Sequence, residues 1–300
     1  VLFNSDLFNG SDFSPLTATE FRQMTGRAGR RGQDNIGFML TVAGKFMDLN
    51  HIRRLLFQKP EDILSRLKND FAMVLNLLLS QTPEDVRKIF ERSLAAYQQN
   101  IRHQGADFSA AQSLWKDFSR HLKFLQQEGF VDKSGTLTDD GRWASKLRLD
   151  YPLLVAQCLR ENAFPQDNEK ILAALVAFLA YDRDDDIKMT VKDLPPKLAL
   201  SFKKVVLAVR PLIHRLENAG FATARLHVLA GVAMYFWAQE HSWDSVIKAT
   251  GIAEGDMATL VLRTADNLRQ IASLKDTYPD IAGCAQRARE TILREPVLFL

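Results

Sequence analysis

Cysteine is scarce in this sequence, which has only Cys158 and Cys284 among its 300 residues. The two lie far apart and neither belongs to a Cys-x-x-Cys pair, which argues against a disulfide framework and against a structural zinc site. Such sparse cysteine usage is typical of a reducing compartment. We therefore expect a cytoplasmic protein.

Long hydrophobic runs are also missing. The longest apolar run, residues 171–181, is much shorter than the ~18 residues that a membrane span needs. The opening residues VLFNSDLFNG lack the basic start and the long apolar stretch of a secretory signal. We expect no contact with a membrane.

Charge of one sign is not in large excess. The 39 Lys and Arg residues nearly match the 36 Asp and Glu residues, and the net charge is +3. The overall charge therefore says nothing about nucleic acid, and only a local cluster can point to a binding surface.

The sequence does contain helical periodicity over most of its length, and the expected fold class is mainly α. Apolar residues three or four positions apart make one stripe along each predicted helix, and from residue 151 onward everything is predicted to be helical. Pro211 should kink or split its helix. The predicted helices cover residues 83–100, 109–129, 152–161, 169–181, 200–219, 223–239, 243–249, 255–276 and 280–293.

The first 46 residues have a mixed pattern. Residues 16–28 predict a helix with Thr17 as its N-cap and Glu20 at the capping-box spacing. Gly29 and Gly32 should end it, and the apolar residues 36–42 predict a short buried strand.

Residues 129–150 have the pattern that ends a winged-helix module. Gly129 ends a helix, short strands are expected around a Ser134-Gly135 turn, and another helix follows Asp139. A helix followed by an unrelated hairpin gives the same pattern. Farther on, the acidic residues 182–186 suit either a divalent ion or a solvated loop, and we interpret them as a loop, so no metal site is expected.

An arginine-rich stretch, FRQMTGRAGRRG, follows the N-cap of the first helix. Arg27 is four residues after Gln23 and should share its helical face, and Arg30 comes near the helix end. Guanidinium groups suit phosphate oxygens, and arginines displayed from a helix end are what an arginine finger requires. The alternative is a solvated basic turn.

The stretch EFRQMTGRAGRRGQDNIG resembles motif VI of superfamily-two helicases, Q-x-x-G-R-x-G-R, in the form of the Ski-two-like DExH-box RNA helicases. The residues LKFLQQEGFVDKSGTLTDDGRWASKL resemble the winged helix of that group. WDSVIKATGIAEGDMATLVLRTADNLRQI resembles its C-terminal helical domain, DSHCT. The resemblance implies the end of a second RecA-like domain in residues 1–46, connecting helices and a winged helix in 47–150, and a DSHCT-like helical bundle in 151–300.

The resemblance implies catalytic roles for Arg30, as the arginine finger, and for Arg27. Gln23 and Arg27 would contact the nucleotide with Arg30 and couple it to motion. The parent protein would use ATP and Mg, but this sequence has neither a G-x-x-x-x-G-K-[ST] loop nor a DExH motif. The family places both motifs upstream of motif VI, and no initiator Met opens the chain, so we expect a C-terminal fragment of a larger helicase or a natural remnant. We expect it to bind no ATP or Mg and to hydrolyse no ATP by itself.

The resemblance also implies that the helix after Glu254 lies under a translocating nucleic-acid strand. Its apolar stripe should face the core, and the opposite stripe offers hydrogen-bonding side chains. Members of the family often carry a basic residue where Thr259 stands, and the alternative is a solvated helix face. The candidate contacts are Thr259, Arg263, Asn267 and Gln270.

The predicted function is the C-terminal part of an ATP-dependent helicase that unwinds RNA by strand translocation. A repair-type DNA helicase and a non-catalytic nucleic-acid or protein adaptor are the alternatives. The expected partners are single-stranded RNA, with DNA as an alternative, and the upstream RecA-like domains. Ski-two-like RNA helicases often carry a long inserted arch domain beside the winged helix. Residues 98–109 are too few to form such an arch, which favours a minimal, bacterial-type protein.

Overall fold

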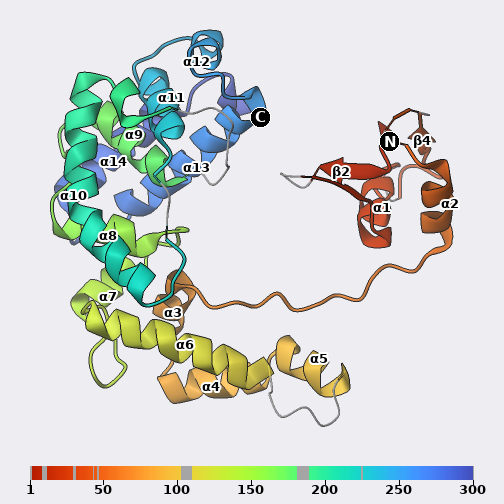
Figure 1. The fold of residues 1–300 in the computed structure, drawn as a ribbon, viewed down its shortest axis with the longest axis horizontal. Helices are drawn as coiled ribbons and strands as arrows, with labels where there is room; N and C mark the ends of the chain where they lie inside the picture. Colours follow the sequence, from red (N-terminus) through yellow and green to blue (C-terminus); the bar gives the residue numbers. More distant parts are fainter. Residues whose placement is uncertain are drawn as a thin grey trace. The chain divides into compact units, whose positions relative to one another are not determined.

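The computed structural model describes residues 2–8, 12–29, 32–42, 44–45, 47–102, 110–180, 189–223 and 226–299. The described chain is mainly helical, so the predicted fold class is confirmed. It forms two compact units, Val1–Ser65 and Arg66–Leu300 (Figure 1).

Short strands and two helices form the first unit. β1 (Leu2–Phe3) pairs in parallel with β4 (Leu40–Thr41), and β2 (Asp6–Phe8) pairs antiparallel with β3 (Phe13–Pro15). The helices α1 (Ala18–Thr25) and α2 (Leu49–Phe57) pack together. α2 contributes to this small core, so the compact unit includes residues up to Ser65, while the domain bounds drawn at residue 46 stay a prediction. The buried core residues are Leu16, Ala18, Phe21, Ile52 and Leu55.

The capping box predicted at Thr17 is confirmed. The Glu20 backbone N–H donates to Thr17 Oγ1 at 3.3 Å, and the Thr17 N–H donates to the Glu20 carboxylate at 2.9 Å. These bonds satisfy N–H groups that have no partner inside the helix.

The buried strand predicted at residues 36–42 is wrong in burial and in extent. Only Leu40 and Thr41 form a strand, and within the described residues only β1 pairs with them. Within the described part of the chain no second layer covers these side chains, and Ile36 and Phe38 are 70% and 73% exposed. The apolar run alone could not reveal whether a neighbouring layer is present.

The second unit begins with helices on either side of a tight hairpin. They are α3 (Phe71–Leu77), α4 (Pro83–Glu91), α5 (Leu94–Arg102), α6 (Ala110–Gln127) and α7 (Asp139–Ala144). The strands predicted beside Gly135 reduce to one bridge between Val131 and Leu137. The winged helix stays a prediction.

The helix predicted over residues 83–100 is in fact two helices. The Ser93 hydroxyl donates to Phe90 O at 2.7 Å and accepts from Ala96 N–H at 3.3 Å, so it ends α4 and caps α5. Only the first part of the predicted stripe is buried, with Val86 and Phe90 inside and Tyr97 63% exposed.

The rest of the second unit is a bundle around α9 (Glu169–Ala180), whose residues from Ile171 onward are all buried. A helix that is apolar on every side is expected at such a centre. In Figure 1, α10, α11, α13 and α14 surround it. The bundle also contains α8 and α12, and its helices other than α9 are α8 (Pro152–Arg160), α10 (Pro196–Asn218), α11 (Val228–Ala238), α12 (Trp243–Thr250), α13 (Glu254–Ala272) and α14 (Pro279–Ile292).

Three local details of the bundle concern a proline, a glycine and the two cysteines. Pro211 lies inside α10 without splitting it. At Gly231 of α11, an added Cβ would lie 2.2 Å from Phe178 Cζ on α9, so only glycine lets these helices approach so closely. Cys158 and Cys284 are free and buried, and burial raises the pKa of both thiols.

The predicted acidic loop 182–186 lies outside the described residues. Across the described ranges, His, Cys, Asp and Glu side chains nowhere gather in a group that could hold a metal ion. None of the helices in those ranges has both the length and the apolar content of a membrane span.

Candidate functional site

The first candidate site is α1 and the turn that follows it. Gln23 lies on α1 and Arg27 lies after it, and both side chains are exposed. The helix ends at Thr25, so Arg27 is in the turn and does not share a helical face with Gln23 as predicted. Arg30 lies outside the described residues.

Glycines shape this turn. Gly29 and Gly32 have φ angles of +84° and +80°, which other residues rarely adopt. An added Cβ at Gly37 would lie 2.2 Å from the Ala28 carbonyl oxygen. The arginine-rich segment is therefore held by close backbone contact, which fixes the exit of the chain from α1.

A carboxylate from a distant part of the unit binds the N-terminus of α1. Glu61 accepts hydrogen bonds from the backbone N–H groups of Ala18, at 3.0 Å, and Thr19, at 2.8 Å. Hydrogen bonds with the Thr19 side chain and with nearby N–H groups lower the pKa of Glu61 to about 2. Arg22 adds a bond of 2.9 Å to Gln58 O. The segment after α2 is thereby attached to the helix that carries Gln23.

The second candidate site is the solvent side of α13, in the other unit. Its predicted apolar stripe is confirmed, because Met257, Leu260, Val261, Thr264, Leu268 and Ile271 are all buried. Thr259 is exposed and its hydroxyl donates to Gly255 O at 2.8 Å, while Asn267 is half-buried. Arg263 donates to the Asp150 carboxylate at 2.6 Å.

Gln270 does not lie on the exposed stripe, so that expectation is wrong. It is only 7% exposed and its carbonyl oxygen accepts from the Arg148 backbone N–H. Its amide donates to Asp266 at 2.8 Å. The reason is tertiary, because the segment before α8 packs over this end of α13 and Gln270 satisfies its backbone groups.

Arg148 is a cation beside α13 that the sequence analysis missed. With Lys146, Arg269 and Gln270 it lines a hollow of about 620 Å³, and among the described residues its side chain has no ion-pair partner. The sequence KLRLD alternates apolar and charged residues, and this alternation could have indicated Arg148. Leu147 and Leu149 are buried, and Lys146, Arg148 and Asp150 are exposed. Such alternation places Lys146, Arg148 and Asp150 on one side.

The same hollow also contains negative charge. Burial alone would raise the pKa of Asp266, but hydrogen bonds from Arg269 and Gln270 outweigh it and lower that pKa below its usual range. Asp266 is therefore ionised at neutral pH, and Arg269 donates to it at 2.7 Å. Arg148 and Arg263 are the cations best placed for phosphate oxygens beside α13.

The DSHCT (NUC185) domain family matches residues 134–300, which is more than half of the chain. The chain is 34% identical to the ATP-dependent DNA helicase Hel308 of Thermoplasma acidophilum over 150 residues, 47% of this chain and 21% of that protein. It is 28% identical to human Superkiller complex protein 2 over 221 residues, 73% of this chain and 17% of that protein.

A third relative is the human Exosome RNA helicase MTR4, which is 38% identical over 79 residues, 26% of this chain and 8% of that protein. The chain spans about a fifth or less of the length of these curated relatives. The bacterial origin stays a prediction, and human proteins are among the relatives. The chain belongs to the DSHCT domain family and corresponds to the C-terminal part of a Ski-two-like superfamily-two helicase.

Proposed function

We propose that the chain is the C-terminal region of an ATP-dependent helicase that unwinds RNA by translocating along one strand. In this proposal Arg30 is the arginine finger, while Gln23 and Arg27 contact the ATP and couple it to motion. The ATP and its Mg would be held mainly by an upstream RecA-like domain. Guanidinium groups neutralise charge that develops on the transferring phosphoryl group.

The observation that carries the strand contact is the polar side of α13. A helix with one fully buried stripe presents Thr259, Arg263 and Asn267 on its other side. Arg148 adds a cation from the segment before α8. Arginine and amide side chains at such spacing suit phosphates, ribose hydroxyls and base edges.

The hydrogen bonds from the N-terminus of α1 to Glu61 suggest how a movement of α1 on nucleotide binding could reach the rest of the chain. Because Glu61 and Gln58 bind α1 directly, a shift of that helix would pull the segment that continues toward Ser65. We propose that this attachment transmits ATP-dependent motion to the rest of the chain.

RNA is favoured as substrate because two relatives, MTR4 and Superkiller complex protein 2, match the chain, and the former is named an RNA helicase. The competing candidate is a DNA helicase, favoured by the similarity to Hel308. The test is fluorescence anisotropy with single-stranded RNA and DNA of the same base sequence, at one salt concentration. Tighter binding of RNA supports the proposal. Equal or tighter binding of DNA favours the competing candidate.

A further inference from the structure

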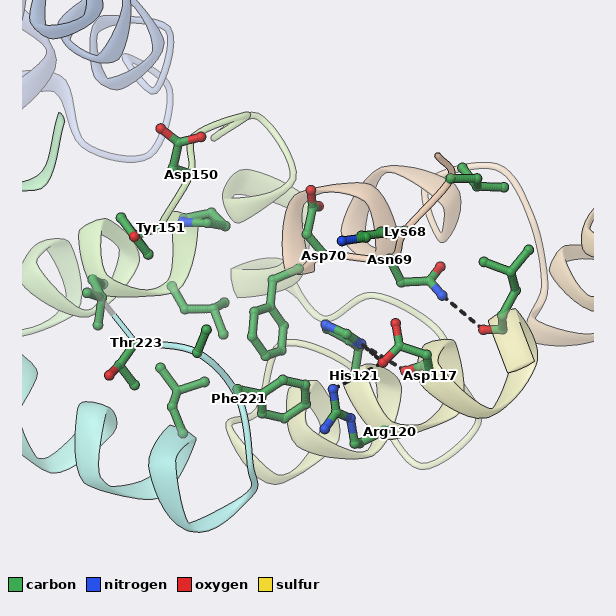
Figure 2. Close-up of a pocket in the computed structure, with 18 of the residues that line it drawn as sticks. Lys68, Asn69, Asp70, Asp117, Arg120, His121, Asp150, Tyr151, Phe221 and Thr223 are labelled. Atoms are coloured by element: carbon green, nitrogen blue, oxygen red, sulfur yellow. Dashed lines mark hydrogen bonds and ion pairs between the residues drawn. The ribbon is translucent and has the colours of Figure 1, made fainter. Parts of the chain in front are cut away.

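A cavity of about 570 Å³ lies in the second unit (Figure 2). It is bounded by the segment before α3, by α6, by the start of α8 and by the residues after α10. Its volume falls in the range of small-molecule sites. Apolar side chains form most of its wall, among them Phe71, Leu114, Leu153, Leu154, Leu216 and Phe221.

His121 faces this cavity with one ring nitrogen that has no partner among the described residues, and Asn69 of the same cavity has a buried Oδ1 without a partner there. Only 5% of His121 is exposed, and its ring packs against Phe71 and Phe221 at centroid distances of 4.8 and 4.7 Å. Its Nδ1 lies 2.8 Å from the Asp117 carbonyl oxygen, which can only accept, so the proton is on Nδ1. In the neutral ring Nε2 is then an acceptor.

No hydrogen-bond partner of Nε2 occurs among the described residues. Figure 2 shows this nitrogen pointing away from Asp117, on the side where Lys68 and Asp70 lie. This nitrogen is open to the cavity, so a group inside the cavity that carries an N–H or O–H can donate to it.

The rim narrows the class of ligand. Arg120 is occupied, because it donates to Asp117 at 3.1 Å and to Gly220 O at 3.3 Å. Lys68 is exposed and forms no ion pair with any described residue, but the carboxylates of Asp70 and Asp150 line the same rim, so the rim does not favour an anionic ligand. Apolar walls and an inward-facing acceptor therefore suit an uncharged flat nitrogen heterocycle with N–H donors, such as a nucleobase.

The cavity and the hollows beside α13 share lining residues. Asp70 and Asp150 line both this cavity and a neighbouring hollow that includes Arg148. Arg148 also lines the hollow that Lys146 and Arg269 share. The chain of hollows leads from the stripe of α13 to His121, along the side of the molecule where a bound strand is proposed.

We propose that this cavity receives an unstacked nucleobase of the strand that α13 contacts, with an N–H of the base donating to His121 Nε2. The inference rests on the proposed strand contact for the source of the base. Enzymes that bind an unstacked base in a pocket offset the lost stacking with contacts of this kind.

The test compares an intact single-stranded RNA decamer with an abasic sugar-phosphate strand of equal length, both followed by anisotropy on the whole chain. His121→Phe keeps a ring in place but removes the acceptor, and Thr223→Trp fills the cavity from another wall. His214→Phe is the matched control, because that histidine is exposed on α10 and lines no described cavity. We expect both cavity variants to lower the affinity for the intact strand about five- to tenfold and to leave the affinity for the abasic strand unchanged.

If the cavity variants lower the affinity for both strands equally, or for neither, the inference is overturned. The proposed function is then still supported as long as the wild type binds the intact strand. If the wild type binds no strand, the proposed function fails, and adenosine is titrated instead while the His121 ring is followed by NMR. A saturable shift, absent in Thr223→Trp, would keep the cavity as a nucleobase site. No shift would end that proposal as well.

Discussion

The guanidinium of Arg263 on α13 donates a hydrogen bond of 2.6 Å to the carboxylate of Asp150, in the segment before α8. Asp150 thus competes with any phosphate for this arginine. Its side chain is 63% exposed, so a strand can reach the pair. Replacing Asp150 and replacing Arg263 should therefore change the affinity for single-stranded RNA in opposite directions.

Asp150→Asn should strengthen the binding of single-stranded RNA. The change removes a negative charge from the strand path and releases the Arg263 guanidinium, so we expect an affinity gain of roughly two- to fivefold at low salt. Anisotropy titrations measure it. Glu91→Gln is the control, because Glu91 forms only a weak surface pair with Arg87, at 3.7 Å, and lines neither hollow beside α13. An equal gain in both variants would show that Asp150 acts through net charge alone.

Glu61→Gln should loosen the start of α1. The uncharged amide accepts less strongly and presents an N–H₂ group to the helix N-terminus, so exchange at the Ala18 and Thr19 amides should quicken roughly two- to tenfold. NMR hydrogen exchange on the whole chain measures it. Asp62→Asn is the matched control, since Asp62 is exposed and forms no hydrogen bond with any described residue.

The same carboxylate makes the α1 attachment sensitive to acid. Because hydrogen bonds with Thr19 and neighbouring N–H groups lower the pKa of Glu61 from 4.5 to about 2 in the folded chain, its stabilising effect is complete above pH 4.5 and is lost as pH falls toward 2. Protection factors of Ala18 and Thr19 should fall over that window in the wild type and change less in Glu61→Gln. Identical pH profiles would contradict the assignment.

Gly231→Ala should destabilise the second unit by about 1–3 kcal/mol, because the new Cβ meets the Phe178 ring. Gly255→Ala on α13 is the control, because nothing lies within 4 Å of its added Cβ, and it should be neutral or slightly stabilising. All four tryptophans belong to the second unit, so their fluorescence during urea unfolding follows it. A loss of stability in Gly255→Ala equal to that in Gly231→Ala would refute the packing argument.

Arg294 joins the end of the chain to α11. Its guanidinium lies 3.3 Å from the Trp237 ring centroid and donates to Trp237 O and His241 O at 2.9 and 2.7 Å. We expect Arg294→Ala to lower the free energy of unfolding by about 1–3 kcal/mol, measured in the same way. Arg287→Ala removes only a weak surface pair of 3.9 Å and should cost much less. Similar losses would contradict a special role for Arg294.

The features that the sequence predicted well are those governed by local chemistry. The start of α1 depends on Thr17 and Glu20, three residues apart, and α9 is apolar on every side. Such patterns act through neighbours along the chain, so they are visible without a structure. Most helices of the bundle begin within a residue or two of the prediction for this reason.

The predictions that were wrong concern features that depend on which other parts of the fold pack against them. Residues 36–42 have the composition of a buried strand, yet within the described residues no layer covers them. Gln270 has the spacing of an exposed residue, yet the backbone of Arg148 covers it. Arg148 itself was overlooked because its partners on α13 are distant in sequence, although the alternation around it was readable.

The most direct test of the central claim is the salt dependence of single-stranded RNA binding by the wild type, Arg263→Ala and Arg287→Ala. The account predicts that Arg263→Ala weakens binding severalfold and reduces the slope of log K against log salt by about 0.7, the value for one phosphate contact on a single strand. Arg287→Ala on α14 should match the wild type. If Arg263→Ala and Arg287→Ala give the same slope as the wild type, α13 does not contact the strand.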